Sequence, residues 1–295
     1  MKFPKIVLIK YSLLLALVAC FVIVSYFARQ TPKEVHQPAE EASVDAKKFF
    51  DNELFTKGVS GRIDFKIDKP VKGAIVPHHM LSAYLMSGLF SQFGHDFDTI
   101  IVLGPNHSAT GENIAYTSDI PFETAFGRVE VDKVIIGKIT GNSAIKIDND
   151  ILGEEYSVNI PINYIKRYLP VSKVVPLVLN ETNDINKING LALVIEPYLN
   201  DRVLVVASVD LSHYLGETEA REKDLQTIKA IGSGDYRLIK QFDDSNLDSS
   251  SSVILLDMLM KHIGADDFQL LINTNSAEIT GYNKDVTSYV LGIYN

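Results

Sequence analysis

Short apolar runs alternate with longer segments of mixed polarity from about residue 61 to the end of the chain. Each run is rich in Val, Ile or Leu and is bounded by turn residues, which is typical of buried strands. The predicted strands are 73–76, 99–103, 174–179, 203–207, 268–274 and 286–294, and the predicted helices are 79–93, 160–168, 185–199, 217–231 and 252–263. This alternation predicts an α/β fold: a single domain over 61–295 with a central, largely buried β-sheet flanked by helices.

An apolar segment precedes this domain. Residues 11–28 carry no charge, and as a helix they would be about 27 Å long, close to the hydrocarbon thickness of a bilayer. Three lysines lie before the segment. We therefore expect a single-pass transmembrane helix in the cell membrane, with residues 1–10 in the cytoplasm and the C-terminal domain on the extracytoplasmic side.

Two alternatives remain open for the same segment. One is a cleaved signal peptide. The other is a lipoprotein signal, because residues 17–20 read Leu-Val-Ala-Cys and resemble a bacterial lipobox ending at Cys20. Residues 29–60 are polar and contain Pro32 and Pro38, so we expect a flexible tether there, to which 45–54 could add a short helix.

Composition narrows the chemistry. The chain has 37 acidic and 28 basic residues and a net charge of −9, which disfavours a nucleic-acid partner. Cys20 is the single cysteine, so neither an intrachain disulfide nor a cysteine-based zinc site can form. Any metal site must therefore use His, Asp or Glu.

Three of the predicted strands end in turns that contain histidine. His78 follows the strand at 73–76, His107 follows 99–103, and Asp210 and His213 follow 203–207. Sites in open α/β sheets form outside the carboxyl ends of the strands, and imidazole is a good ligand for Fe, Cu or Zn. We therefore predict a divalent metal site on the three histidines, with Asp210 as an acceptor that orients a ligating imidazole. His79 is expected to cap the next helix or to face solvent.

Six motifs follow one another between about residue 70 and the C-terminus. They are Gly73-Ala-Ile-Val-Pro-His78, Leu103-Gly-Pro-Asn-His107, Phe126-Gly-Arg-Val-Glu-Val-Asp132, Glu154-Glu-Tyr-Ser157, Ser208-Val-Asp-Leu-Ser-His-Tyr214 and Thr287-Ser-Tyr289. In this order they resemble the Memo-like family, whose bacterial members are named AmmeMemoRadiSam system protein B. The resemblance implies the fold of the class III (LigB-like) extradiol dioxygenases, with a non-haem metal pocket whose histidines fall on His78, His107 and His213.

The sequence departs from the family pattern at two positions. The family usually has Glu-Glu-His-Ser where this chain has Tyr156 in place of the histidine, so a phenol replaces a plausible acid/base group. Many members also have a cysteine before the last long helix, where this chain has Asp248. Asp248 could be an oxygen ligand, which would favour Fe²⁺ or Mn²⁺, or it could cap the helix.

The resemblance therefore implies a non-haem metal oxidoreductase of dioxygenase type. Fe²⁺ is the first choice of metal, with Cu or Zn as alternatives, and Tyr156 and Asp210 are the candidate catalytic residues. A small molecule such as a catechol would bind at the open metal positions, and the membrane would be a partner through the N-terminal helix. Three alternatives are a metal- or ligand-binding protein without turnover, a structural protein with a vestigial pocket, and a zinc hydrolase.

Overall fold

The computed structural model describes residues 16–26, 41–94, 97–141 and 144–295. Residues 16–26 are helical, and Ala42–Asn295 form one compact unit. None of the helices within these ranges is long and apolar enough to cross a membrane. Of the predicted span at 11–28, residues 11–15 and 27–28 lie outside the described residues, as do 1–10 and the tether residues 29–40.

An eight-stranded mixed sheet forms the centre of the domain, with the order β10-β11-β2-β9-β3-β8-β4-β7. Strands β2, β9, β3 and β8 run parallel. Strands β10 and β11 pair antiparallel to their neighbours, and β4 pairs antiparallel to β8 and parallel to β7. Every residue of β2, β3, β9 and β11 is buried, as expected for a sheet covered on both faces. The strands are β2 (Gly73–Val76), β3 (Thr99–Pro105), β4 (Ala115–Thr117), β7 (Ile145–Ile147), β8 (Lys173–Leu179), β9 (Val203–Ser208), β10 (Phe268–Asn275) and β11 (Ser288–Tyr294).

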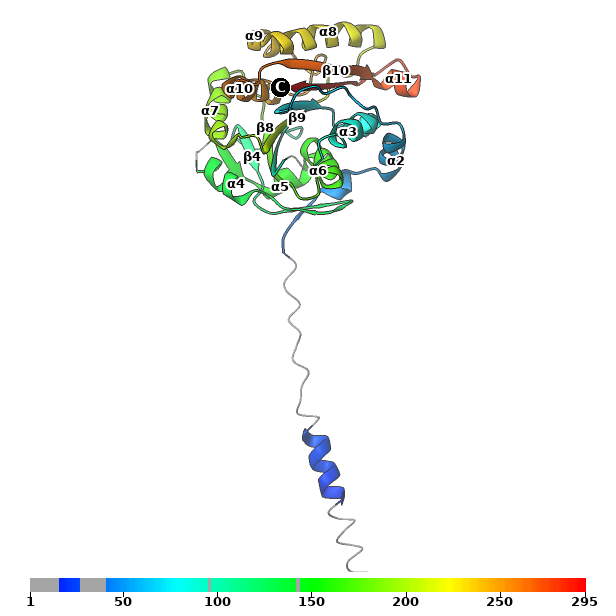
Figure 1. The fold of residues 1–295 in the computed structure, drawn as a ribbon, viewed down its shortest axis with the longest axis vertical. Coiled ribbons are helices and arrows are strands. Elements are labelled where there is room, and N and C mark those ends of the chain that lie inside the picture. Colours follow the sequence, from blue (N-terminus) through cyan, green and yellow to red (C-terminus); the bar gives the residue numbers. More distant parts are fainter. Residues whose placement is uncertain (1–15, 27–40, 95–96, 142–143) are drawn as a thin grey trace, which may run out of the picture. The chain divides into compact units, whose positions relative to one another are not determined.

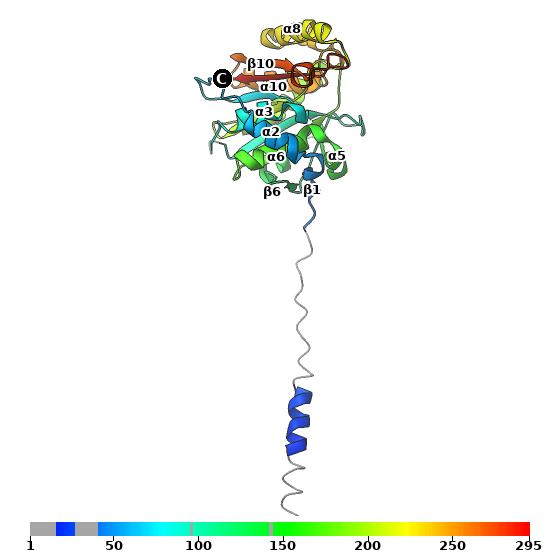
Figure 2. The same ribbon diagram turned by 90° about the vertical axis from the view of Figure 1, so that its right-hand side faces the viewer.

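Helices cover both faces of this sheet (Figure 1). Helices α3 (Ala83–Phe90) and α6 (Tyr156–Tyr168) pack together and α6 contacts β3, while α7 (Ile185–Ile195) and α10 (Ser250–His262) pack together and α10 contacts β9. Helix α8 (Glu217–Ser233) lies over β10 at the edge of the sheet (Figure 2). The shorter helices are α2 (Asn52–Ser60), α4 (Lys133–Ile139), α5 (Asn149–Glu154), α9 (Tyr236–Ile239) and α11 (Ser276–Thr280).

All six predicted strands and all five predicted helices are present, with boundaries that shift by a few residues. The predicted helix at 79–93 begins as a 3₁₀ turn, Met80–Ser82, before α3. The single-domain α/β fold with a buried central sheet is confirmed. The short strands β4 and β7 and the small sheet of β1 (Val44–Asp45), β5 (Phe122–Thr124) and β6 (Gly127–Val129) were not predicted.

The compact unit begins at Ala42, earlier than the predicted boundary at residue 61. Val44 is buried and pairs with Phe122 of β5, and the ring of Phe55 in α2 lies 5.5 Å from the ring of Tyr164 in α6. Residues 42–60 therefore belong to the domain, because their few apolar side chains are buried in its core.

Candidate metal centre

The three histidine-bearing turns meet at one edge of the sheet because β2, β9 and β3 are adjacent and parallel. His78 lies two residues beyond β2, His107 two residues beyond β3, and Asp210 two residues beyond β9. The carboxyl ends of neighbouring parallel strands lie side by side, which is where open α/β sheets place their ligands. The sheet order therefore brings together residues that lie far apart in the sequence.

His78 is a buried, neutral imidazole. Its Nδ1 lies 3.3 Å from the hydroxyl of Ser208, and that hydroxyl donates its own hydrogen to the carbonyl of Ser157. Nδ1 of His78 must therefore be the hydrogen-bond donor, which leaves the lone pair on Nε2. Burial, with a further contribution from His107, lowers the pKa of His78 to about 3, so the ring is uncharged at neutral pH.

The Nε2 atom of His78 faces two carboxylates. It lies 3.3 Å from Oδ2 of Asp248 and 3.6 Å from Oδ2 of Asp210. Asp210 is also held by the backbone N–H of His78, which donates to its Oδ1 at 3.2 Å. A lone pair that faces carboxylate oxygens is repulsive unless a proton or a cation lies between them, and a bound metal ion would meet this requirement.

His107 is oriented by Glu155. The Nδ1 atom of His107 lies 2.8 Å from Oε1 of Glu155, and its backbone N–H donates to Oε2 at 2.8 Å. Burial acts to raise the pKa of Glu155, but the hydrogen bonds and charge of His107 and the backbone N–H of Ser157 outweigh it and lower the pKa. The ionised Glu155 therefore accepts the Nδ1 proton, and Nε2 of His107 points into the site, 4.0 Å from Oδ2 of Asp248.

Glu155 was not among the predicted site residues, although it is part of the quoted motif 154–157. It also caps α6 by accepting a hydrogen bond from the backbone N–H of Ser157. Close packing between β3 and α6 supports this arrangement: a Cβ atom on Gly104 would lie 2.4 Å from Oγ of Ser157. Gly104 thus lets α6 start directly beside the turn that carries His107.

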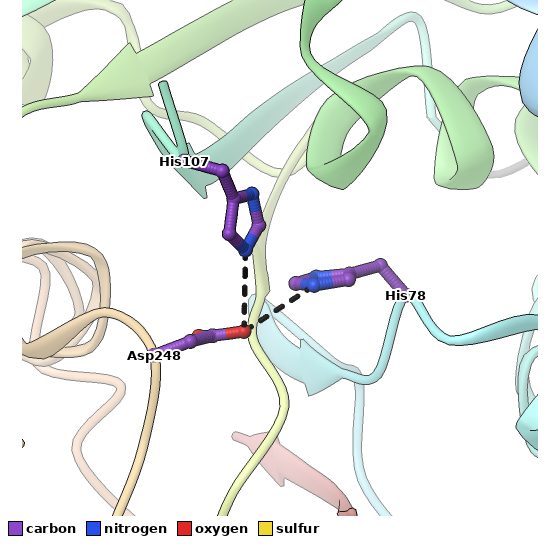
Figure 3. Close-up of side chains that lie close together, drawn as sticks. All are labelled: His78, His107 and Asp248. Atoms are coloured by element: carbon purple, nitrogen blue, oxygen red, sulfur yellow. Dashed lines mark ion pairs between the residues drawn. The ribbon is translucent and has the colours of Figure 1, made fainter. Parts of the chain in front are cut away.

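Asp248 points into the site and does not cap α10. The cap is Ser249, whose side chain accepts a hydrogen bond from the backbone N–H of Ser252. His78, His107 and Asp248 converge on one point (Figure 3), and one ligand atom from each lies within 4.8 Å of the others. Burial and the neighbouring charge of Asp210 raise the pKa of Asp248 well above its usual range.

His213 belongs to a second group, formed with Asp210 and Asp248, whose ligand atoms also lie within 4.8 Å of one another. Among the described residues no group within that distance holds all three histidines. The donors are therefore two overlapping sets that share Asp248. Burial raises the pKa of Asp210 to about 6, against the opposing effect of nearby histidines.

Two buried polar atoms at this site have no hydrogen-bond partner within the described ranges: Nδ1 of His213 and Oδ1 of Asp248. A buried polar atom without a partner is costly, and in native proteins it usually has a ligand, an ion or a water. The nitrogen and oxygen donors around these atoms match the preferences of Fe, Cu and Zn. The residues present therefore fit a divalent metal ion.

Tyr156 and His79 line the same cavity, which has a volume of about 600 Å³. The Tyr156 ring stacks on His107 with centroids 4.2 Å apart, and burial raises the pKa of its phenol further above neutrality. Tyr156 is therefore a neutral hydrogen-bonding group and not a base near pH 7. His79 caps the 3₁₀ turn through a hydrogen bond from the backbone N–H of Leu81 to its Nδ1, as predicted.

Comparison with known proteins shows which sequences this chain is similar to. Residues 48–293 match the family model described as Memo-like protein. A MEMO1 family protein of Caldivirga maquilingensis is 27% identical over 231 residues, covering 74% of this chain and 81% of the relative. One from Thermotoga neapolitana is 23% identical over 259 residues, covering 83% and 90%.

A solved structure has a similar fold. The crystal structure of an uncharacterized protein, JW3007, from Escherichia coli K12 superimposes with a TM-score of 0.54 at 10% sequence identity. The match covers 76% of this chain and 100% of that one. At this level of identity the likeness concerns the fold alone.

Proposed function

The chain belongs to the Memo-like protein family, and we propose that its cavity binds a divalent metal ion used in non-haem redox chemistry on a small molecule. One observation carries this proposal: ligand atoms of His78, His107 and Asp248 lie within 4.8 Å of one another, and the buried Oδ1 of Asp248 has no partner among the described residues. Two imidazoles with a carboxylate are the donor set of many non-haem Fe²⁺ oxygenases.

His78 and His107 would hold the ion through their Nε2 atoms and Asp248 through its carboxylate, with Asp210 and His213 adjacent. A bound ion would supply open positions for O₂ and substrate and would lower the pKa of a coordinated hydroxyl. Glu155 keeps the His107 lone pair directed at the site, and Ser208 does the same for His78. Fe²⁺ is the first candidate, with Cu and Zn as alternatives.

Tyr156 supports a second candidate function, metal or ligand binding without turnover. The stacked phenol occupies the position next to His107, and burial raises its pKa, so it is a poor proton acceptor at neutral pH. The two candidates differ in O₂ consumption, because only an oxygenase takes up O₂ in proportion to product.

Measurements of metal content and O₂ uptake test the two candidate functions. The unaltered protein, His107→Ala and His262→Ala are loaded anaerobically with Fe²⁺, desalted and analysed for bound metal. His262 is the matched control, because it lies at the far end of α10 and its Nδ1 pairs with Glu196 at 3.0 Å. We expect metal loss in His107→Ala only, and equal metal in all three proteins would refute the site. O₂ uptake with a panel of catechols then separates the oxygenase from the binding protein.

Residues 11–28 carry a separate proposal, attachment of the protein to the cell membrane with the domain on the extracytoplasmic side. Its support is the uncharged run of the sequence and the lysines that precede it. Fractionation of cells that produce the full chain, beside a chain lacking residues 1–28, tests it. Recovery of both proteins in the same soluble fraction would contradict it.

A further inference from the structure

The charges around the cavity indicate which class of small molecule it binds, and this inference rests on the function proposed above. We propose that the cavity selects an organic amine over an anion of the same shape, and that Asp244 is the specificity-determining residue that receives the ammonium group.

Acidic groups dominate the cavity wall. Four acidic residues line it, Glu181, Asp210, Asp244 and Asp248, and none of the described lining residues is Lys or Arg. A divalent ion would be balanced by two of them, Asp210 and Asp248. Glu155 adds a further buried negative charge behind His107. The loaded site would therefore repel a carboxylate or phosphate on the organic ligand.

Glu181 is not available to a ligand. Its Oε2 pairs with Nζ of Lys240 at 3.0 Å, and its Oε1 accepts the backbone N–H of Ser251 at the start of α10. This ion pair neutralises Lys240, and Glu181 stabilises the N-terminal end of α10.

Asp244 differs from the other three carboxylates. Its backbone carbonyl accepts the N–H of His213 at 2.8 Å, which holds it beside the metal-binding turn. The residue is exposed, and its carboxylate forms no hydrogen bond or ion pair with any described residue. Asp244 therefore places an unpaired acidic residue among those that line the cavity.

Two further observations point to a cationic ligand. Asp248 lines the cavity with a side chain that is only 7% exposed, and its buried Oδ1 has no partner within the described part of the chain. Tyr214, the residue after His213, also lines the cavity and is 76% exposed. An aromatic side chain in a cavity lined by acidic residues is a favourable environment for an ammonium group.

The test uses the full chain loaded with Fe²⁺ under argon and three catechols that differ only in the 4-substituent. The aminoethyl compound is a cation, the ethyl compound is neutral and the carboxymethyl compound is an anion. Calorimetric titration gives the three dissociation constants for the unaltered protein, for Asp244→Asn and for Asp266→Asn. Asp266 is an exposed aspartate beyond the other end of α10 and serves as the matched control.

We expect the amine to bind about three- to tenfold more tightly than the ethyl compound, and the anion to bind more weakly than both. Asp244→Asn should remove the advantage of the amine and Asp266→Asn should keep it, and added salt should reduce it. Three results would overturn the inference: equal binding of amine and anion by the unaltered protein, an unchanged amine advantage in Asp244→Asn, or no binding of any catechol. Failure of Fe²⁺ itself to bind would instead overturn the proposed function, and this inference with it.

Discussion

Replacing Glu155 by glutamine tests how the site is oriented. Glu155 accepts three hydrogen bonds at 2.8 Å each, from Nδ1 and the backbone N of His107 and from the backbone N of Ser157. Glutamine has the same shape, but an NH₂ group, which donates, replaces one of the two accepting carboxylate oxygens. If the NH₂ group faces the backbone N–H of His107, two buried donors oppose each other. If the amide is flipped, His107 must carry its proton on Nε2, which removes the lone pair from the metal site.

The expected changes in stability and in metal affinity can each be given a magnitude. An unsatisfied buried donor costs about 1–3 kcal/mol, so the free energy of unfolding of the metal-free protein should fall by about that amount. Loss of a group that orients a ligating histidine typically lowers metal affinity by about 10- to 100-fold, which equals about 1.4–2.7 kcal/mol. The mutation should therefore weaken metal binding even at temperatures where the protein is fully folded.

Urea unfolding of the metal-free protein measures the loss of stability, and a competition titration with a chelator of known affinity measures the loss of metal affinity. Glu154→Gln is the matched control, because the side chain of Glu154 is 77% exposed and pairs with Lys48 on the surface. An exposed pair of this kind contributes at most about 1 kcal/mol. If Glu155→Gln bound metal within twofold of the unaltered protein, Glu155 would not orient His107 for a metal.

Three further outcomes follow from the structure. Metal affinity should fall by at least about tenfold per pH unit below pH 6, because burial raises the metal-free pKa of the ligand Asp248 above its usual range and that of the adjacent Asp210 to about 6, and a carboxylate must lose its proton to bind a cation; a flat competition titration between pH 5 and 7 would contradict this. Gly104→Ala should lower the free energy of unfolding by about 1–3 kcal/mol, because the added Cβ would lie 2.4 Å from Oγ of Ser157, whereas Gly137→Ala meets no atom within 4 Å and should not destabilise the protein. Phe55→Ala should cost about 3–5 kcal/mol in chemical unfolding, since Phe55 is 8% exposed; no change would place residues 42–60 outside the folded domain.

Much of the fold could be predicted because its central strands are buried on both faces. Such strands must be continuous apolar runs, and the runs at β2, β3 and β9 stand out from the surrounding polar sequence. The short strands at the sheet edge and residues 42–60 lack that signal. Val44 stands between polar residues and Phe55 belongs to the short apolar pair Leu54-Phe55, so they are recognisable as core only from their partners Phe122 and Tyr164.

Local sequence was also enough to find the turns that carry His78, His107 and Asp210, because each turn directly follows a buried parallel strand. The grouping of their donors depends on distant contacts. Glu155 and His107 lie 48 positions apart, and Asp248 and Asp210 lie 38 positions apart. The direction of each side chain decides whether Asp248 caps α10 or enters the cavity. Shifts of a few ångströms likewise decide whether His213 joins the other two histidines. Such directions are set by the packing of α6 and α10 against the sheet, which no local pattern of residues encodes.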